Sequence, residues 1–245
     1  MKSIEVKQII VVTDGKSNMG GNPVTAAAEA SKYNIVVNAI GIIGDREDEE
    51  HLNEIVQISK AGGGTWESTL VSNLGCTLLA VTQKTINKTI HTIVGNQLKE
   101  IIGGSVEDIP PEKRSKVIQY MEQLGEEAEI KCCILMDCSG SMSNKMSTAR
   151  QSIIELINSL QARAGRSKVA VIAFPGERGE FVKIFQPFTE DIKEIKSRIL
   201  ELKAGGITPT AAAINKAVEL IEGKDQDEIE QIIINSEPLL KKSMI

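Results

Sequence analysis

Aromatic residues are scarce in this chain of 245 residues, at 3% of the total. Sugar-binding platforms and single-stranded nucleic-acid sites depend on aromatic side chains for stacking, so both classes are disfavoured. The charge argues in the same direction, because 28 basic and 33 acidic residues leave a net charge of −5 and no basic block. We therefore expect no nucleic-acid partner.

Long hydrophobic runs are also missing. No apolar run approaches the ~20 residues of a membrane-spanning helix, and the N-terminus has no signal-peptide core of the usual length. The cysteines have no metal-type spacing, and three of the four crowd into one apolar run, where buried thiols are common. They are Cys76, Cys132, Cys133 and Cys138. These absences predict a soluble, cytoplasmic protein with no membrane partner.

The chain does have an alternation of short apolar runs and amphipathic segments, with 41% hydrophobic residues. In the first third, strands are predicted at 8–13, 35–42 and 65–69, separated by helices at 23–32 and about 45–60. This order is typical of a parallel sheet covered by helices. The length leaves open whether there is one sizeable domain or two small ones.

The middle of the chain is helical in period from 71 to 102. A straight helix of that length would measure about 48 Å, more than a small domain needs, so we expect a break near Gly75 or Gly95. A connector with glycine and proline follows at 103–111, before a short amphipathic helix at 112–124.

The second half again alternates strands and helices. It opens with the most apolar strand, at 130–136, and then predicts a helix at 145–164, a hairpin of strands at about 168–176 and 181–188, and helices at about 190–202 and 211–221.

Three motifs lie at the ends of predicted strands or just before a predicted helix. In α/β folds, ligand-binding loops lie at the carboxyl ends of the strands. DCSGSMS, directly after the most apolar strand, carries Asp137, Ser139 and Ser141 in the Asp-x-Ser-x-Ser signature of the von Willebrand factor type A (vWA) family. GGITPTAAAI, with Thr208, resembles the family's threonine loop, and KQIIVVTDG resembles its strand ending in Asp-Gly, here with Asp14.

The order of the motifs departs from the family. An ordinary vWA domain has the Asp-x-Ser-x-Ser strand first and the Asp-Gly strand third, whereas here the Asp-Gly strand comes first. The resemblance therefore implies one circularly permuted domain, which is tolerated when old termini lie close together. It divides into 1–84, the usual C-terminal half; 85–127, a helical connector; 128–223, the usual N-terminal half; and 224–245, an acidic tail.

The fold that the resemblance implies is an α/β, open doubly wound, mostly parallel six-stranded sheet of order 3-2-1-4-5-6. The arrangement resembles a small family of permuted bacterial vWA proteins associated with endospore formers, and hence with sporulation. One segment complicates it, because EQIIINSEP at 230–238 resembles the N-terminal KQIIVVTDG. Two strands could thus compete for one position in the sheet.

The resemblance also implies a metal-ion-dependent adhesion site for Mg²⁺ or Mn²⁺. Mg²⁺ takes six oxygens and keeps several waters, which hydroxyl and carboxylate side chains suit. The three hydroxyl ligands would come from Ser139, Ser141 and Thr208, with Thr210 as the alternative to Thr208, while Asp137 and Asp14 would hold metal-bound waters and supply charge.

Each motif alone has a simpler explanation. Asp14–Gly15 is an ordinary turn after a strand, Thr208–Pro209 is a good helix N-cap and first-turn pair, and Ser141 is a possible cap of the next helix. The conjunction of the three motifs in the predicted strand context favours the metal site.

The implied function is a non-enzymatic, divalent-cation-dependent protein-binding module whose partner presents an Asp or Glu carboxylate to the metal. A general base is missing, since His51 and His91 lie outside the motifs and Lys16 is the one lysine in a motif loop. Two alternatives stay open: a metal-assisted, phosphatase-like hydrolase, and the vWA partner subunit of an ATPase, since the chain has no Walker A loop. The chain is expected to be a monomer, or a dimer in which half-domains are swapped.

Overall fold

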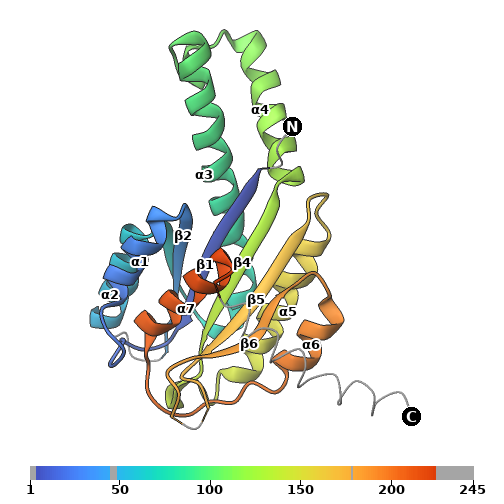
Figure 1. Cartoon of the computed structure of the whole chain (residues 1–245). Helices are drawn as coiled ribbons and strands as arrows, with labels where there is room; N and C mark the ends of the chain where they lie inside the picture. The colour runs from blue at the N-terminus through green and yellow to red at the C-terminus, as the bar shows by residue number, and fades with distance from the viewer. Residues whose placement is uncertain (1–3, 45–48, 178, 225–245) are drawn as a thin grey trace.

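The structure, a computed structural model, describes residues 4–44, 49–177 and 179–224 (Figure 1). Within these residues, no helix combines the length and the apolar character that a bilayer crossing requires. The acidic tail beyond Lys224, with the strand-like segment 230–238, lies outside the described residues, as does the side chain of His51. The predicted competition between two strands therefore stays a prediction.

Six strands form one sheet in the order β3-β2-β1-β4-β5-β6. Neighbouring strands are parallel except for β5 and β6, which form the predicted antiparallel hairpin. The predicted fold class and strand order are thus confirmed. The strands are β1 (Glu5–Thr13), β2 (Ile35–Ile42), β3 (Gly63–Thr69), β4 (Glu129–Asp137), β5 (Ser167–Phe174) and β6 (Lys183–Thr189).

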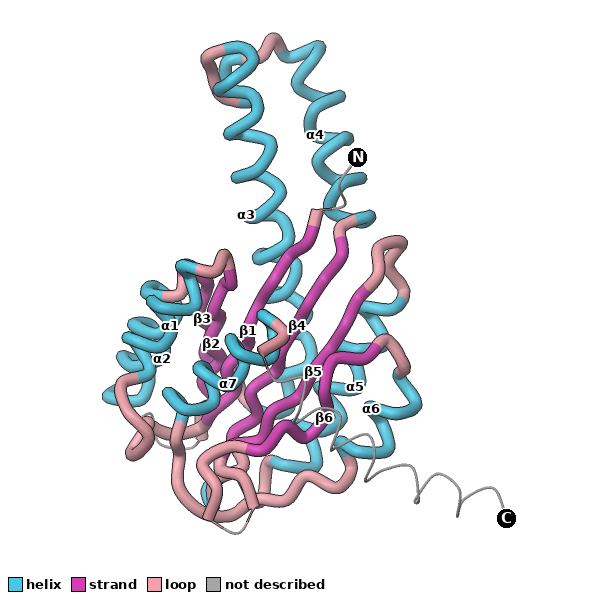
Figure 2. Tube along the Cα trace, viewed as in Figure 1, coloured by secondary structure: helices cyan, strands magenta, loops and turns pink. Residues whose placement is uncertain are grey.

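Helices cover both faces of the sheet, which explains why its central strands are almost continuously apolar (Figure 2). One face packs against α1, α2 and α7, and the other packs against α3, α5 and α6. The α-helices are α1 (Pro23–Lys32), α2 (Glu49–Ala61), α3 (Leu74–Ile102), α4 (Pro111–Glu127), α5 (Met146–Gln161), α6 (Ile192–Ile199) and α7 (Thr210–Glu222).

The strand β1 lies at the centre of the sheet and joins the two halves of the chain. Ile9 of β1 is opposite Val37 of β2 on one side and Cys133 of β4 on the other. Because β1 and β4 are parallel neighbours, the loops that follow Thr13 and Asp137 leave the same edge of the sheet.

The helices α3 and α4 form a hairpin that extends beyond the opposite edge of the sheet (Figure 1). A 3-10 turn at Val71–Asn73 precedes α3, so there is an irregularity beside Gly75, but the helix continues through Gly95. The predicted break near Gly95 is therefore wrong. The physical reason is that buried side chains, from Leu78 to Val94, keep the helical period along α3 after it leaves the sheet and meets α4.

We predict that Gly95→Ala stabilises the protein. A Cβ at Gly95 meets no atom within 4 Å, so alanine adds no clash and lowers the entropy of the unfolded chain. The free energy of unfolding in urea should rise by about 0.5–1 kcal/mol. As a matched control, Gly62→Ala would place a Cβ in steric clash with the Cβ of Val37 and should destabilise the protein. A destabilised Gly95→Ala variant would contradict the continuous helix.

Candidate metal centre

Asp137 is the last residue of β4, and its side chain is completely buried. The Thr13 hydroxyl donates to its Oδ2 at 2.6 Å, and the backbone N–H of Ser139 donates to its Oδ1 at 2.7 Å. Burial, with a smaller contribution from the neighbouring Asp14, raises the pKa of Asp137 to about 6 against the lowering effect of these hydrogen bonds. The protein thus holds a carboxylate here that favours a nearby cation.

A contiguous row of oxygen atoms lies where β1 and β4 end, and it is formed by Ser139, Ser141 and Asp14. The Ser139 and Ser141 Oγ atoms lie 3.0 Å apart, and Ser141 Oγ donates to Asp14 Oδ1 at 2.6 Å. Neighbouring ligand oxygens of an octahedral Mg²⁺, at 2.0–2.1 Å from the ion, are about 2.9 Å apart. The spacing of the two serine hydroxyls therefore matches that of adjacent Mg²⁺ ligands.

Lys145 supplies positive charge to the same row. Its ammonium group lies 2.5 Å from Asp14 Oδ2, and the Asp14 side chain has no exposed surface. Sequence reasoning missed this lysine and singled out Lys16 instead, which pairs with Glu50 on α2 at 2.9 Å. Its position in the sequence was the available signal, because Lys145 lies four residues after Ser141, at the N-cap of the helix that follows the motif loop.

The threonine loop reaches both strand-end loops through its backbone. The Gly205 N–H donates to the carbonyl of Cys138 at 2.6 Å. The Thr208 N–H donates to Asn18 Oδ1 at 3.0 Å, and the backbone N–H of Asn18 donates to the Thr208 carbonyl at 3.2 Å. Thr210 is buried, and its hydroxyl has no hydrogen-bond partner among the described residues. The three motifs of the sequence are thus brought together.

The simpler explanations of two motifs do not fit the structure. Ser141 lies in the 3-10 turn Gly140–Met142 and does not cap α5, which begins after Lys145 without a side-chain cap. Thr208 does not cap α7 either, because the N-cap position belongs to Pro209. The Ser141 hydroxyl instead donates to Asp14, so neither residue serves as a helix cap.

The donor set is rich in hydroxyls and has two carboxylates. Among the described residues, no three His, Cys, Asp or Glu side chains gather as a metal cluster. Oxygen ligands without thiolate or imidazole suit hard cations such as Mg²⁺ and Mn²⁺ better than Zn²⁺. The residues present therefore fit the metal that the motifs imply.

The described part of the site lacks an activated nucleophile. The Ser139 hydroxyl contacts Ser141, whereas His91 is exposed on α3. Burial raises the pKa of the Cys138 thiol to about 12, so this residue stays protonated and unreactive at neutral pH.

The fold and these loops define a class, the open α/β sheet with a ligand site at the carboxyl ends of its central strands. Profiles of the von Willebrand factor type A domain match residues 2–74 and 132–235 separately. The chain belongs to the von Willebrand factor type A domain family. Domains of this family are, in general, metal-dependent protein-interaction modules.

Relatives show how far the likeness extends. The chain is 36% identical over 220 residues to the uncharacterized protein YabS of Bacillus subtilis, covering 89% of each chain. A crystal structure of an uncharacterized protein from Alicyclobacillus acidocaldarius has a TM-score of 0.83 at 36% identity, over 91% of this chain and 96% of that one. The magnesium-chelatase 67 kDa subunit of Heliobacterium mobile is 35% identical over 101 residues, which are 41% of this chain and 14% of that subunit.

Proposed function

We propose that the protein is a non-enzymatic module that binds a protein partner through Mg²⁺ or Mn²⁺. Ser139, Ser141 and Thr208, with Thr210 as the alternative, provide the hydroxyl ligands, while Asp137 and Asp14 hold metal-bound waters. The observation that carries the proposal is the row of oxygens from Ser139 through Ser141 to Asp14, with separations of 3.0 and 2.6 Å.

The bound metal would supply a Lewis acid that accepts a carboxylate of the partner's Asp or Glu. The protein's own residues orient the hydroxyls and hold compensating charge. Asp137 is positioned by the Thr13 hydroxyl and by the Ser139 backbone N–H, so its carboxylate is held at the end of β4, next to the serine motif. The absence of an activated nucleophile in the described site supports binding rather than hydrolysis.

The test uses two capped peptides, acetyl-Gly-Asp-Gly-amide and its Asn counterpart, titrated into ¹⁵N-labelled protein. In Mg²⁺, the Asp peptide should shift the amide resonances of Ser139 to Ser141, and the Asn peptide should not. With EDTA, neither peptide should bind. Equal binding of the Asp peptide in Mg²⁺ and in EDTA would overturn the proposal, as would Mg²⁺-dependent turnover of phosphoester substrates.

A second candidate is a subunit of a larger enzyme assembly, favoured by the likeness to a magnesium-chelatase subunit. It predicts that the protein in a native extract elutes as a large complex in Mg²⁺ and as the free 26.5 kDa chain in chelator. Elution as the free chain under both conditions would exclude it. We also predict that the isolated protein is a monomer rather than a swapped dimer. Sedimentation as a 26.5 kDa species would agree with this prediction, and sedimentation as a dimer would contradict it.

We further infer that the domain is circularly permuted, with its usual C-terminal half at 1–84 and its usual N-terminal half at 128–223. The separate matches of two family profiles to the two halves support this. The last turn of α7 also lies beside the first residues of β1 and β4. Lys7 Nζ of β1 is 3.0 Å from Glu222 Oε1, and Lys131 Nζ of β4 donates to the Ile221 carbonyl at 2.6 Å. Localisation in the cytoplasm fits the four free cysteines, and a role in sporulation stays a prediction.

Restoring the family's usual order should leave the site intact. In the test variant, Ile245 is joined to Met1 and the chain is opened between Gly104 and Ser105, in the loop between α3 and α4. We expect a folded protein with the Mg²⁺ affinity of the parent chain, measured by calorimetry, because domains tolerate permutation where termini approach each other. The uncut parent chain, measured in parallel, provides the control. A folded variant without Mg²⁺ binding, or one that does not fold, would contradict the permutation.

A further inference from the structure

A polar cavity lies beside the candidate metal centre, and we name it the Glu54 cavity. Its volume is about 540 Å³. It lies between the loop that follows β1, the first turn of α1 and the exposed side of α2. The lining residues that bear on its chemistry are Lys16, Ser17, Glu50, Asn53, Glu54 and Gln57.

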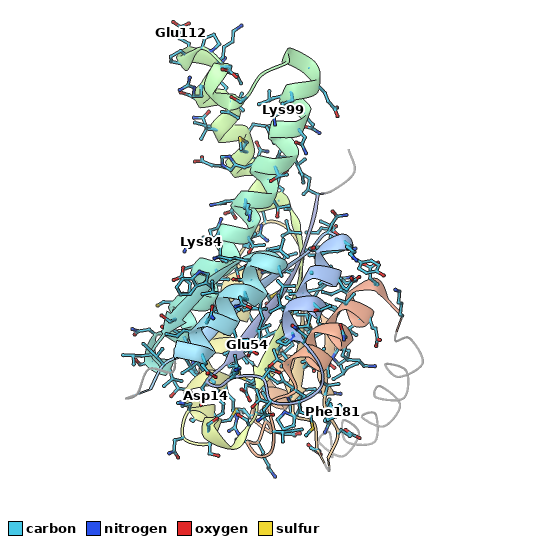
Figure 3. The ribbon with its side chains drawn as sticks, turned by 90° about the vertical axis from the view of Figure 1, so that its left-hand side faces the viewer. Asp14, Glu54, Lys84, Lys99, Glu112 and Phe181 are labelled. Atoms are coloured by element: carbon cyan, nitrogen blue, oxygen red, sulfur yellow. The ribbon has the colours of Figure 1, made fainter. Side chains whose placement is uncertain are left out.

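The cavity and the metal centre share one loop. Ser17, which lines the cavity, donates from its hydroxyl to the Thr208 carbonyl at 3.2 Å, and it is three residues from Asp14. Three residues of extended chain span at most about 11 Å, so a single short segment of a partner can reach both places. Asp14 and Glu54 are labelled on the same side of the molecule in Figure 3.

Charge and burial indicate what the cavity accepts. Glu54 is half-buried, and its Oε2 accepts the Ser17 N–H at 2.7 Å. Burial raises the pKa of Glu54, while the Ser17 hydrogen bond and the charge of Lys16 lower it. Glu50 is paired with Lys16 at the exposed rim, so the less solvated carboxylate of Glu54 is the one that a cation would stabilise most.

The neutral lining favours a guanidinium group among cations. The side-chain amides of Asn53 and Gln57 line the cavity together with Glu54, whereas the Asn22 Oδ1 already accepts two backbone N–H groups as the cap of α1. The carbonyl oxygens of Asn53 and Gln57 are acceptors, and a guanidinium presents five N–H donors in a plane that can engage a carboxylate and amide oxygens together. A cavity of about 540 Å³ leaves ample room for one arginine side chain.

We propose that the Glu54 cavity receives an arginine side chain of the protein partner, a few residues from the acidic residue that completes the metal site. This proposal rests on the proposed function, because it assumes the same partner. It adds a rule of recognition: the partner segment carries an acidic and a basic residue, and the basic residue distinguishes it from other carboxylate-bearing segments.

The first experiment tests arginine binding to the cavity in the absence of the metal. In EDTA, N-acetyl-arginine methylamide and its neutral citrulline analogue are titrated into ¹⁵N-labelled full-length protein. The arginine probe should shift the resonances of Asn22, Asn53 and Gln57, and the citrulline probe should bind about tenfold more weakly, the loss expected for one charge-assisted hydrogen bond. Equal binding of the two probes, or shifts confined to other parts of the molecule, would overturn the proposal.

Two variants and one control sharpen this result. Glu54→Gln keeps an acceptor for the Ser17 N–H but loses the charge, and it should weaken the arginine probe about tenfold. Gln57→Arg places a guanidinium at the cavity wall and should abolish binding of the probe. Glu122→Gln, an exposed change of the same charge on α4, should have no effect. Unchanged affinity in both cavity variants would overturn the proposal.

The second experiment separates this proposal from the proposed function. Acetyl-Gly-Asp-Gly-Gly-Arg-Gly-amide is titrated in Mg²⁺ beside the same peptide with citrulline. We expect about tenfold tighter binding of the arginine peptide. If Mg²⁺ and the Asp residue bind but arginine adds nothing, the cavity proposal fails alone. If no metal binds while the arginine probe still binds in EDTA, the proposed function fails alone.

Discussion

Asp137→Asn should abolish most of the Mg²⁺ affinity and at the same time stabilise the metal-free protein. The carboxylate of Asp137 is completely buried, and its pKa rises to about 6 because burial disfavours the charged form. Asparagine has nearly the same shape and keeps an acceptor for the Ser139 N–H. Asp137→Asn is thus expected to lower the Mg²⁺ affinity and to raise the stability of the metal-free protein. A substitution that only damaged the fold would lower both.

The size of the stability gain follows from the pKa. A shift from 3.8 to about 6 corresponds to about 3 kcal/mol at most, so we expect a gain of about 2–3 kcal/mol at pH 7.5 in EDTA. The folded pKa lies above the unfolded one, so the charged carboxylate destabilises the fold fully above about pH 6. This penalty shrinks as the pH falls toward 3.8, where the advantage of asparagine should vanish.

The measurement is urea unfolding of both proteins at several pH values, with and without saturating Mg²⁺. Mg²⁺ should stabilise the native sequence by mass action, and the variant should bind it about 10–100-fold more weakly, as for the loss of a group that orients metal ligands. Glu122→Gln serves as the control and should change neither quantity. A variant that is less stable in EDTA at pH 7.5 and binds Mg²⁺ normally would contradict this role of Asp137.

Lys145→Met should raise the Mg²⁺ affinity by about tenfold while destabilising the metal-free protein. The ammonium of Lys145 lies 2.5 Å from Asp14 Oδ2, where it provides the positive charge that a bound metal would otherwise provide. Metal binding must weaken this ion pair. Without the lysine, the buried Asp14 side chain loses this ion pair, which should cost about 1–3 kcal/mol of stability in EDTA.

Thermal unfolding and calorimetry test the two effects of Lys145→Met together. The Mg²⁺-induced rise in Tm should be larger in Lys145→Met than in the native sequence. Lys145→Arg keeps the positive charge and should show no gain in affinity, and Lys84→Met, at the Glu67 ion pair on the outside of the domain, should change neither quantity. Weaker Mg²⁺ binding by Lys145→Met would show that the lysine supports the metal rather than competing with it.

The arrangement of the sheet was predictable because each strand carries a clear periodic signal. The apolar runs that became β1, β2 and β4 are buried on both faces, and Asn22 and Pro23 set the start of α1 through a cap and a first-turn proline. The order of the strands, however, came from the resemblance of the motifs to the vWA family. Periodicity alone does not say which strands are neighbours.

The length of α3 was harder to predict, because a glycine such as Gly95 weakens a helix only modestly and tertiary packing outweighs it. Within the site, the motif residues were identified from spacing, but Lys145 was not. Its contact with Asp14 joins residues 131 positions apart, and only the pairing of β1 with β4 brings them together. The Glu54 cavity has the same origin, since its walls come from one loop and two helices that are separated in the sequence.

The central claim is that one metal site is built from both halves of the chain, with Asp14 from the first half and the serine motif from the second. Calorimetric titration of Mg²⁺ into the native sequence and into Asp14→Asn, with Glu122→Gln as control, tests it most directly. We predict saturable binding by the native sequence and by the control, and a loss of at least about tenfold in affinity for Asp14→Asn. Identical isotherms for all three proteins would contradict the claim.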